Sequence, residues 1–520
     1  MNKRAQEMNL SETPSYDAIV IGAGIGGLGC AAKLAAAGRK VLVLEKDNHI
    51  GGTSYIFRRN GYGFPMGPLS FSFPWKVMEF LGDVGVDKEI RFQRNHFELI
   101  TPDFEIICSQ PLDELQESLK ALFPAEAEGF REFFPLLKQI IRETSEIWAR
   151  RPEYFSGRKR RDEAAPADGP DRDKLERIRK WSDTPCAAIL DGYFSNAAVK
   201  NFLGSQGTSP PEMSLLNLGF MWKIMSEEGI WFPDCGIHGL NDLLQKSLIR
   251  RGGEIRLNSA VKEILVENGR AHAIVTEKDE AIPCRWIVSN ADYKKTFLEL
   301  IDPRRIPADF VDDVKSSPYT GSELCVYLGI DPKKADLSRL RATHVFFRRR
   351  LQSERDLEPV DFDGREVEIC LWSENAPGLV PERKASLVVR VGLPYGLFSA
   401  FRLGEKRRTI GYQDYKRQLA HNLIHAVESL VPDLSSAAEV MEIATPLTYE
   451  DWGHRTGGSI AGWSWSAGDK KMPGGRLLIE TPVENLLMAG IYASTELFLG
   501  GVPTSLYTAG AAADLILEKD

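Results

Sequence analysis

Four glycines and one acid near the start of the sequence have the types and spacing of a dinucleotide-binding site. In YDAIVIGAGIGGLGCAAKL, Gly22, Gly24 and Gly27 form the pattern Gly-x-Gly-x-x-Gly, Gly26 lies inside it, and Glu45 follows at the usual offset of a ribose-binding acid. Gly22 would allow a tight turn, Gly24 would let the backbone approach a pyrophosphate, and Gly27 would let a helix pack closely on a strand. A carboxylate at Glu45 favours a ribose with a free 2′-hydroxyl, because it repels a 2′-phosphate.

These residues need a strand before the glycines and a helix after them. The run DAIVIG is short, apolar and rich in β-branched residues, which is typical of a buried parallel strand. The alanine-rich stretch after it predicts a helix that ends near Gly38, and KVLVLE predicts a second strand that ends at Glu45. The N-terminus of that helix would direct free N–H groups and a partial positive charge at the phosphates.

A second pair of glycines follows the acid, in EKDNHIGGTS. Gly51 and Gly52 would again let the backbone approach phosphate and ribose, and we expect Lys46, Thr53 and Ser54 to contact the same cofactor. This extension resembles the FAD-binding proteins that include amine oxidases and carotenoid desaturases, so it implies FAD rather than NAD. Because we find no second motif of this kind, we do not expect a separate NAD(P)H domain.

The segment 229–292 predicts a helix over about 238–251, followed by several strands with a turn at Asn268–Gly269. In FAD proteins of this kind the chain returns here to the nucleotide domain. The resemblance therefore implies that the backbone at Val261 borders the adenine. It also implies that the strand and loop WIVSNAD bring Asn290 near the cofactor.

The stretch NLLMAGIYASTELFLGGVPTSLYTAGAAADLIL predicts a strand, a glycine-rich loop and an alanine-rich helix. We expect Gly490, Gly501 and Val502 to bind the cofactor. The helix N-terminus would aim at the pyrimidine edge of a flavin, where negative charge collects on reduction. Glu496 is the only acid in the loop before Gly500, which makes it the candidate base or polarising group, with an ordinary surface loop as the alternative.

Length and composition exclude several classes of protein. The chain has 520 residues, which favours two or more domains, and its formal net charge of -8 argues against nucleic acid as a partner. Seven scattered cysteines lack the spacing of a zinc or redox site, and no metal cluster is evident, so we expect reduced thiols in a cytoplasm. The polar leader MNKRAQEMNLSETPS has no apolar core for secretion, and no apolar run is long enough to span a bilayer.

The predicted fold is α/β, with a discontinuous Rossmann-like FAD domain and a mixed α+β substrate domain. Residues about 76–150 are expected to be mostly helical, and the charged stretch at 150–180 is expected to be a solvated surface loop. Strands are predicted at SELCVYLGI and ASLVVRVGLP, and a helix at YKRQLAHNLIHAVESLVP. The FAD domain is assigned to 1–75, 230–300 and 475–520, and the substrate domain, which would face the membrane, to 76–229 and 301–474.

Together, the segments 16–70, 229–300 and 480–517 resemble the family of phytoene desaturases, carotenoid isomerases and retinol saturases. The resemblance implies noncovalent FAD, a long apolar tunnel, and a polyene or isoprenoid substrate drawn from a membrane. It also implies desaturation, saturation or isomerisation, none of which demands a strong acid or base, so we expect few ionisable residues at the reacting face. The family has Phe-Asp-x-Gly where this chain has Phe64-Pro65-Met66-Gly67, which removes the hydrogen bonds of that acid. His454 and Tyr507 are further catalytic candidates, with structural roles as the alternative.

Several stretches fit an apolar substrate and a membrane surface. FPMGPLSFSFPW and NLGFMWKIMSEEGIWF are rich in Phe, Met and Trp, which suits an elongated apolar ligand as well as an ordinary core. Two segments carry clusters of cations that could meet a membrane, and in the one near residue 400 the cations lie beside apolar residues. The alternative for both segments is an ordinary solvated surface. They contain Arg158, Lys159, Arg160 and Arg161, and Leu397, Phe398, Phe401, Lys406, Arg407 and Arg408. We expect a cytoplasmic protein, with peripheral membrane contact left open.

Two other functions remain open at this point. An FAD amine oxidase would share the first motif and the closing helix, but it would need a polar site for a small amine. A prenyl-lipid carrier of the kind found in Rab escort proteins and GDP-dissociation inhibitors shares the fold and lacks working flavin. The complete glycine set and Glu45 favour a bound flavin over the carrier. The electron acceptor is unknown, with oxygen, a quinone or another carrier as the options.

Overall fold

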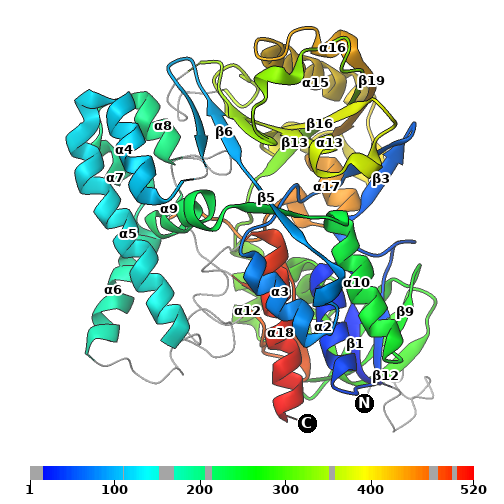
Figure 1. The fold of residues 1–520 in the computed structure, drawn as a ribbon. Coiled ribbons are helices and arrows are strands. Elements are labelled where there is room, and N and C mark those ends of the chain that lie inside the picture. Colours follow the sequence, from blue (N-terminus) through cyan, green and yellow to red (C-terminus); the bar gives the residue numbers. More distant parts are fainter. Residues whose placement is uncertain are drawn as a thin grey trace.

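A mixed sheet with a parallel centre forms the lower right of the molecule in Figure 1. The computed structural model describes residues 16–108, 110–150, 169–204, 213–350, 358–467, 478–494 and 500–519. Within them, β20, β12, β1, β2 and β9 run parallel in that order. β11 pairs antiparallel with β12, and β10 pairs antiparallel with β11. The bounds are β1 Tyr16–Ile21, β2 Val41–Leu44, β9 Glu254–Arg256, β10 Val261–Glu267, β11 Arg270–Thr276, β12 Ala281–Ser289 and β20 Leu486–Met488.

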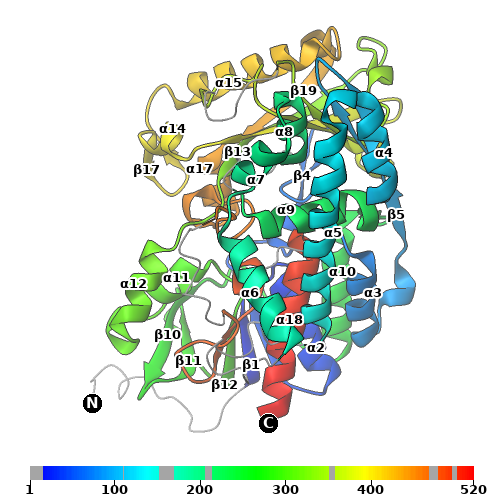
Figure 2. The ribbon, with the colours of Figure 1, turned by 90° about the vertical axis from the view of Figure 1, so that its left-hand side faces the viewer.

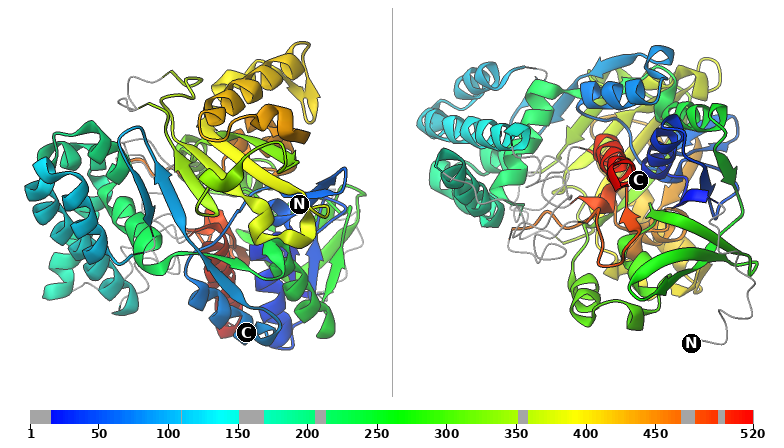
Figure 3. Two further views of the ribbon diagram at one scale, coloured as in Figure 1. Left: turned by 45° about the horizontal axis from the view of Figure 1, so that its top comes forward. Right: turned by 90° about the horizontal axis from the view of Figure 1, so that it is seen from below.

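Helices from distant parts of the sequence pack together beside this sheet. They are α2 (Ile25–Ala36), α3 (Pro74–Asp83), α10 (Gly236–Arg250) and α18 (Gly501–Lys519). Figure 3 shows α18 beside α2. A β-carbon on Gly29 of α2 would lie 3.3 Å from the Ala509 β-carbon of α18, so small residues permit this close approach. Both ends of the described chain therefore meet at one sheet.

A second sheet lies above the first in Figure 1, with the order β19-β13-β16-β15-β14-β6-β7 among the described strands. Its neighbours are antiparallel except for β14 and β6. Alternate residues of β13 face opposite sides: Leu324 packs toward helix α15, which lies over the sheet in Figure 2, whereas Cys325 belongs to the core on the other side. The bounds are β6 Phe97–Ile100, β7 Glu105–Cys108, β13 Ser322–Ile330, β14 His344–Phe347, β15 Val367–Leu371, β16 Ala385–Leu393, β19 Ala438–Ala444 and α15 Tyr412–Glu428.

A group of helices with its own apolar core stands beside the two sheets, at the left of Figure 1. It corrects the prediction of a loop at 150–180, because residues 170–183 form helix α6; residues 151–168 lie outside the described part. Pro170 begins α6, and Asp171 and Asp173 in its first turn favour a helix start. Arg177 of α6 pairs with Glu143 of α5 at 2.8 Å. The bounds are α4 Leu112–Leu122, α5 Ala127–Arg150, α6 Pro170–Asp183, α7 Cys186–Tyr193, α8 Ala197–Gly204 and α9 Leu215–Trp222.

The prediction of mostly helix over 76–150 is wrong for residues 92–108, which form three short strands. β5 (Phe92–Asn95) pairs with β8 (Ile230–Pro233), and β6 pairs with β14. Their partners lie far away in the sequence, so tertiary pairing decides these strands. The remaining bounds are β3 Ile56–Arg59, β4 Tyr62–Pro65, α11 Tyr293–Leu298, α12 Ala308–Ser316, α13 Trp372–Asn375, α14 Gly396–Ser399, β17 Arg402–Gly404, β18 Arg407–Arg408, α16 Leu434–Ala437 and α17 Pro446–Trp452.

Most of the other predicted elements are confirmed within one or two residues. The strands at 17–22, 40–45, 322–330 and 385–394 are β1, β2, β13 and β16, and the helix near 238–251 is α10. The helix predicted at 415–432 is α15, which begins three residues earlier and ends four residues earlier than predicted. Asn268 and Gly269 join β10 to β11 with φ of 50° and 78°, which is the backbone of a tight hairpin turn. The limits of the two domains stay a prediction.

Candidate cofactor and substrate site

The turn between β1 and α2 has room for backbone atoms only. Gly22 has φ +91°, a conformation that favours glycine. A β-carbon on Gly24 would lie 2.7 Å from Nδ2 of Asn290, and one on Gly27 would collide with the carbonyl oxygen of Gly22. Because the turn carries no β-carbons, its backbone can approach a ligand closely, as the glycine spacing predicts.

Helix α2 presents its N-terminus to the same space. It begins after Gly24, which has extended φ and ψ of -69° and 171°, and no acidic residue lies in its first turn. The first N–H groups of a helix lack intrahelical partners and carry a partial positive charge. Such an end is suited to binding a pyrophosphate, and the missing β-carbons make the cradle that FAD requires.

Glu45 lies at the end of β2 and is only 6% exposed. Its Oε2 accepts the N–H of Ala23 at 2.7 Å, and its Oε1 accepts the N–H of Asp47 at 2.9 Å. A carboxylate has about four acceptor sites, so capacity remains for a ribose hydroxyl. Lys46 is exposed and lies 3.6 Å from Glu405 in an ion pair.

The second glycine pair folds back against the first turn. Gly51 forms a parallel bridge with Gly24, and its N–H donates to the carbonyl of Ala23 at 2.8 Å. Gly51 and Gly52 have φ of 105° and 53°. Arg455 donates to Oγ1 of Thr53 at 3.0 Å, which connects this loop to the segment after α17.

Asn290 and Gly490 close the turn from the neighbouring strands. Asn290 follows β12, and its N–H donates to the carbonyl of Ile21 at 2.9 Å. Gly490 follows β20 with φ 91°, and its N–H donates to Oγ1 of Thr508 in α18 at 3.0 Å. The carboxyl ends of three parallel strands therefore meet at this turn, which is where open α/β sheets bind ligands.

One cavity of about 780 Å³ extends from these glycines to the second sheet. Gly27 and Gly490 are not among its lining residues and lie behind its wall. Val261 is the first residue of β10. The cavity is lined by the sequence-predicted residues Gly22, Gly24, Gly26, Glu45, Lys46, Gly51, Gly52, Thr53, Ser54, Val261, Asn290, Gly501 and Val502.

The three catalytic candidates have different outcomes. Glu496 lies outside the described residues. Tyr507 is on α18 but not on the cavity wall, and its ring lies 5.8 Å from that of Trp148. His454 does line the cavity, with Nε2 2.8 Å from Oδ2 of Asp47. Burial opposes ionisation of Asp47, but His454 outweighs it and lowers the pKa of that carboxyl.

An apolar wall of the cavity comes from the two Met- and Phe-rich stretches. Met221 lies on α9, and Ile224 and Met225 lie on the π-helical segment that continues it, Lys223–Glu228. Leu69 and Phe71 line the cavity from the other stretch. π-helical turns are often found at functional sites, and flexible methionines adapt to irregular apolar ligands.

The second sheet adds a charged wall that the sequence did not predict. Arg390 donates from Nε to Oε2 of Glu368 at 2.7 Å, and Nδ1 of His344 lies 3.3 Å from Oε1 of Glu368. Tyr449 donates to Oε1 of Glu323 at 2.6 Å, and Arg390 lies 3.8 Å from the same oxygen. All five side chains line the cavity. This wall therefore carries more ionisable residues than the sequence predicts at the face where a polyene would react.

The pairing sets the protonation states of this wall. Burial opposes the charged form of His344, but Cys370 and Glu368 beside the ring outweigh it and raise the imidazole pKa to about 10. Burial likewise opposes the charged form of Glu368, yet Arg390 and His344 lower its pKa to about 2. Burial raises the pKa of Glu323, despite the nearby Arg390 and Tyr449. Glu368 and His344 are therefore an ionised pair at neutral pH.

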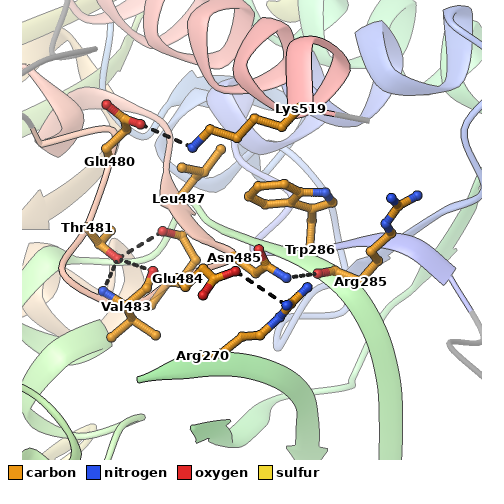
Figure 4. Close-up of a pocket in the computed structure, with 11 residues that line it drawn as sticks. Arg270, Arg285, Trp286, Glu480, Thr481, Val483, Glu484, Asn485, Leu487 and Lys519 are labelled. Carbon is orange, nitrogen blue, oxygen red and sulfur yellow. Dashed lines mark hydrogen bonds and ion pairs between the residues drawn. The ribbon is translucent and has the colours of Figure 1, made fainter. Parts of the chain in front are cut away.

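A second, smaller pocket lies at the opposite end of the parallel strands (Figure 4). It is lined by Arg285 and Trp286 of β12 and by residues just before β20. Lys519 pairs with Glu480 at 3.3 Å, and Arg270 with Glu484 at 3.3 Å, so these four side chains neutralise each other in pairs. It lies away from the glycine turns.

Other expectations concern metal, thiols and membrane. Among the described residues no group of His, Cys, Asp or Glu could hold a metal ion, and none of their helices is both long and apolar enough to cross a bilayer. All seven cysteines are free thiols, and six of them are buried.

The basic and apolar segment at 397–408 differs from its prediction. Phe398 is fully buried and Arg408 is bound to Asp451, so neither can meet a membrane. The exposed apolar side chains nearby are Leu403, Ile410 and Trp452, with Nζ of Lys406 4.1 Å from the centre of the Trp452 ring. The cluster Arg158, Lys159, Arg160 and Arg161 lies outside the described residues.

Comparison with known proteins agrees with this geometry. The family described as flavin containing amine oxidoreductase matches residues 25–517. The chain is 26% identical to prolycopene isomerase of Daucus carota over 87% of its own length and 73% of the relative's. It is 21% identical to all-trans-retinol 13,14-reductase of Danio rerio, over 97% and 86% of the two chains. With phytoene desaturase of Rhodobacter capsulatus it shares 27% identity over 55% and 54%.

Solved structures share the fold. An oxidoreductase from Methanosarcina mazei superposes with a TM-score of 0.61 at 14% identity, covering 95% of this chain and 99% of the other. Cyclohexylamine oxidase from Brevibacterium oxydans gives a TM-score of 0.61 at 14% identity, over 97% and 99%. The predicted Rossmann-like α/β fold is confirmed by these superpositions, and the predicted FAD cofactor by the family match together with them.

Proposed function

The chain belongs to the family of flavin-containing amine oxidoreductases, and we propose that it acts on carbon–carbon bonds of a polyene or isoprenoid lipid. That it is an FAD-dependent oxidoreductase follows from the family. The substrate class is supported by the relatives named for prolycopene, retinol and phytoene.

One observation carries the proposal: a single cavity joins the glycine cradle to an apolar wall. Gly24 and Gly26 line one part of it, and Met221, Ile224 and Met225 line another. A ligand along the apolar wall would share the cavity with the cofactor, and flexible thioethers and branched chains suit an elongated hydrocarbon. A small amine would not need this apolar surface.

The residues of the cradle would bind and orient the cofactor. N–H groups at the start of α2 would hold the pyrophosphate, and Glu45 would accept a hydrogen bond from a ribose hydroxyl. The backbone at Val261 would border the adenine, and the start of α18, at Gly501 and Val502, would face the flavin ring. Bound FAD supplies two-electron chemistry by accepting or returning a hydride. The apolar wall would exclude water from the reacting carbons.

Anaerobic incubation with a polyene tests this function, once with protein that holds oxidised FAD and once after reduction of the FAD with dithionite, because a gain of hydrogen needs the reduced flavin. Retinol, phytoene and a cis-carotene would be offered in detergent, with the visible flavin absorbance followed and the products separated by chromatography. Loss of hydrogen, gain of hydrogen or a changed double-bond geometry would each support the proposal and identify the reaction. A parallel incubation with an amine would be run in air. Hydrogen peroxide formed there, with every polyene unchanged, would contradict the proposal and favour an amine oxidase.

Peripheral membrane contact in a cytoplasmic protein is the second part of the proposal. Leu403 lies on β17 and Ile410 lies two residues after β18, and the exposed Lys406 and Arg407 lie between them in the sequence. Apolar side chains beside cations suit an anionic lipid surface. We expect the protein to sediment with phosphatidylglycerol vesicles, and the double variant Leu403→Ser/Ile410→Ser to sediment less. Equal sedimentation of both proteins would contradict a role for the β17–β18 hairpin.

The electron acceptor needs its own experiment. Reoxidation of the reduced flavin by oxygen or by a quinone, followed by its visible absorbance, would identify the acceptor.

A further inference from the structure

A row of charged side chains crosses the second sheet on the face that lines the cavity. The register places Phe346 of β14 opposite Glu368 of β15, and Glu368 opposite Arg390 of β16. His344 lies on β14 and Glu323 on β13, with 2% and 6% of their surfaces exposed. We name Glu323, His344, Glu368 and Arg390 the charged row.

Stability does not explain the charged row. Removing ions from water costs several kcal/mol per ion, and replacing a buried ion pair by apolar residues is often neutral or stabilising, by about 1–4 kcal/mol. The opposite face of the same strands is stabilised by apolar packing instead, because Leu324, Ile369 and Val389 pack there against the helices. Ionic side chains are found on the cavity face instead, where a ligand can reach them.

A pure hydrocarbon would gain nothing from this wall. It would cover charged groups without offering them a hydrogen bond, which costs free energy. The apolar surface of Met221, Ile224, Met225 and Phe346 adjoins the charged row in the same cavity. The wall therefore suits a molecule that is apolar along its length and polar at one place.

We propose that the charged row binds a neutral oxygen at one end of the substrate, a hydroxyl or carbonyl group. This inference rests on the proposed function and narrows its substrate class. Glu368 pairs with both Arg390 and His344, and Arg390 also lies 3.8 Å from Glu323, so the members of the charged row already have partners of opposite type and do not call for an ionic ligand. A hydroxyl can accept a hydrogen bond from a guanidinium and donate one to a carboxylate.

The wall leaves space at the charged row. Gly392 lines the cavity directly opposite Glu323 in the register, and a β-carbon there would meet no atom nearer than 3.6 Å. A larger side chain would fit without collision, so glycine leaves room beside the acid.

Binding of two matched ligands tests the proposal. All-trans-retinol and its deoxy hydrocarbon, in which hydrogen replaces the hydroxyl, would be titrated into FAD-loaded protein, with quenching of Trp465 and the other tryptophans as the readout. A hydrogen bond to a charged group corresponds to about tenfold or more in affinity. We expect that preference for the alcohol in the unaltered protein. The double variant Glu368→Leu/Arg390→Met, which keeps the net charge, is expected to lose it.

A matched control comes from the same sheet. Arg348 and Glu366 form a buried pair at 3.2 Å that does not line the cavity, so Arg348→Met/Glu366→Leu should keep the preference. If the double variant does not fold, Glu368→Gln takes its place in the test. It retains the shape of the side chain and should reduce the preference for the alcohol. FAD content and circular dichroism would confirm folding.

The outcomes separate the two proposals. Equal affinity for the alcohol and the hydrocarbon would overturn the role of the charged row while leaving the polyene function intact. A preference that survives in the folded Glu368→Leu/Arg390→Met variant would also overturn it. If neither ligand binds and no polyene reacts, the proposed function itself fails, and this inference with it.

Discussion

The side-chain oxygen of Asn290 occupies the space that a β-carbon on Gly26 would need: the two atoms would be 2.6 Å apart. Cα of Gly490 would lie 2.7 Å from the same β-carbon. Asn290 follows β12, Gly490 follows β20 and Gly26 lies at the start of α2, so three segments close on one position. The glycine is required by its neighbours as well as by the cofactor.

Gly26→Ala should therefore yield protein with little FAD, because the turn or Asn290 must move away from the phosphate site. We expect at least about a tenfold loss of FAD affinity, the effect of losing about 1.4 kcal/mol. The ratio of flavin to protein absorbance measures it. Gly82→Ala is the control, since a β-carbon on Gly82 in α3 meets nothing within 4 Å. Equal FAD content in both variants would contradict this account.

Glu45→Gln should weaken FAD binding by about tenfold to a hundredfold, since a hydrogen bond to a charged group contributes about 1.5–3 kcal/mol. The amide nitrogen would also face the N–H of Ala23 or of Asp47, where two donors cannot bond. Titration of apoprotein with FAD by flavin fluorescence measures the change. Glu254→Gln, on β9 and away from the cavity wall, is the matched control and should bind FAD normally.

Asp451 holds the β17–β18 hairpin against α17. Its carboxylate is 1% exposed, pairs with Arg402 at 2.9 Å and with Arg408, and accepts the N–H of Lys406 at 2.8 Å. Asp451→Ala leaves Arg408 without its acidic partner and Arg402 with Glu450 alone, and it should cost about 3–5 kcal/mol in the free energy of unfolding. Asp414→Ala, which removes an exposed acid 3.8 Å from Arg417, should cost less than about 1 kcal/mol. Urea unfolding of both variants is the measurement, and equal losses would refute the role of Asp451.

The His344 and Glu368 pair predicts how stability depends on pH. Glu368 and Cys370 beside the ring raise the pKa of His344 from 6.5 to about 10, so its contribution is complete below pH 6.5 and is lost as pH rises toward 10. The pKa of Glu368 is lowered to about 2 from 4.5, so its contribution is complete above pH 4.5 and is lost as pH falls toward 2.

His344→Gln tests the part of this pH dependence that lies above pH 6.5, because it removes the imidazole that loses its charge there. The difference in free energy of unfolding between the unaltered protein and His344→Gln should shrink as pH rises from 6.5 to about 10. Denaturant unfolding across this range measures it. A difference that does not change with pH would show that His344 is neutral in the folded protein.

Local patterns were enough to predict the first half of the site. The glycines from Gly22 to Gly27 and the acid Glu45 lie within one strand–turn–helix–strand unit, where spacing fixes geometry. The charged row could not be found this way, because its members come from four successive strands and are more than twenty residues apart, so that no short spacing connects them. Alternation in SELCVYLGI separates Glu323 from Leu324, but only the assembled sheet decides which face meets the cavity.

Helix α6 carries two local signals in the sequence that the expectation of a loop did not take into account. Pro170 and the acids after it mark a helix start, and Leu175, Ile178 and Trp181 supply a buried stripe, yet the density of charge suggested a loop. The strands at 92–108 are different. Each is only four residues long, β5 and β6 pair with the distant strands β8 and β14, and β7 pairs with β6.

The packing of α18 against α2 has a consequence for synthesis of the protein. The ribosome makes the glycine turn first and α18 after every other described element, yet Thr508 of α18 is bonded to Gly490 beside that turn. The nascent chain must therefore hold an incomplete cradle until residues 486–519 have emerged from the exit tunnel. Cofactor capture is then a step that follows the synthesis of α18, and a chain cut short before α18 would carry a Rossmann unit with its hydrophobic flank open to chaperones and proteases.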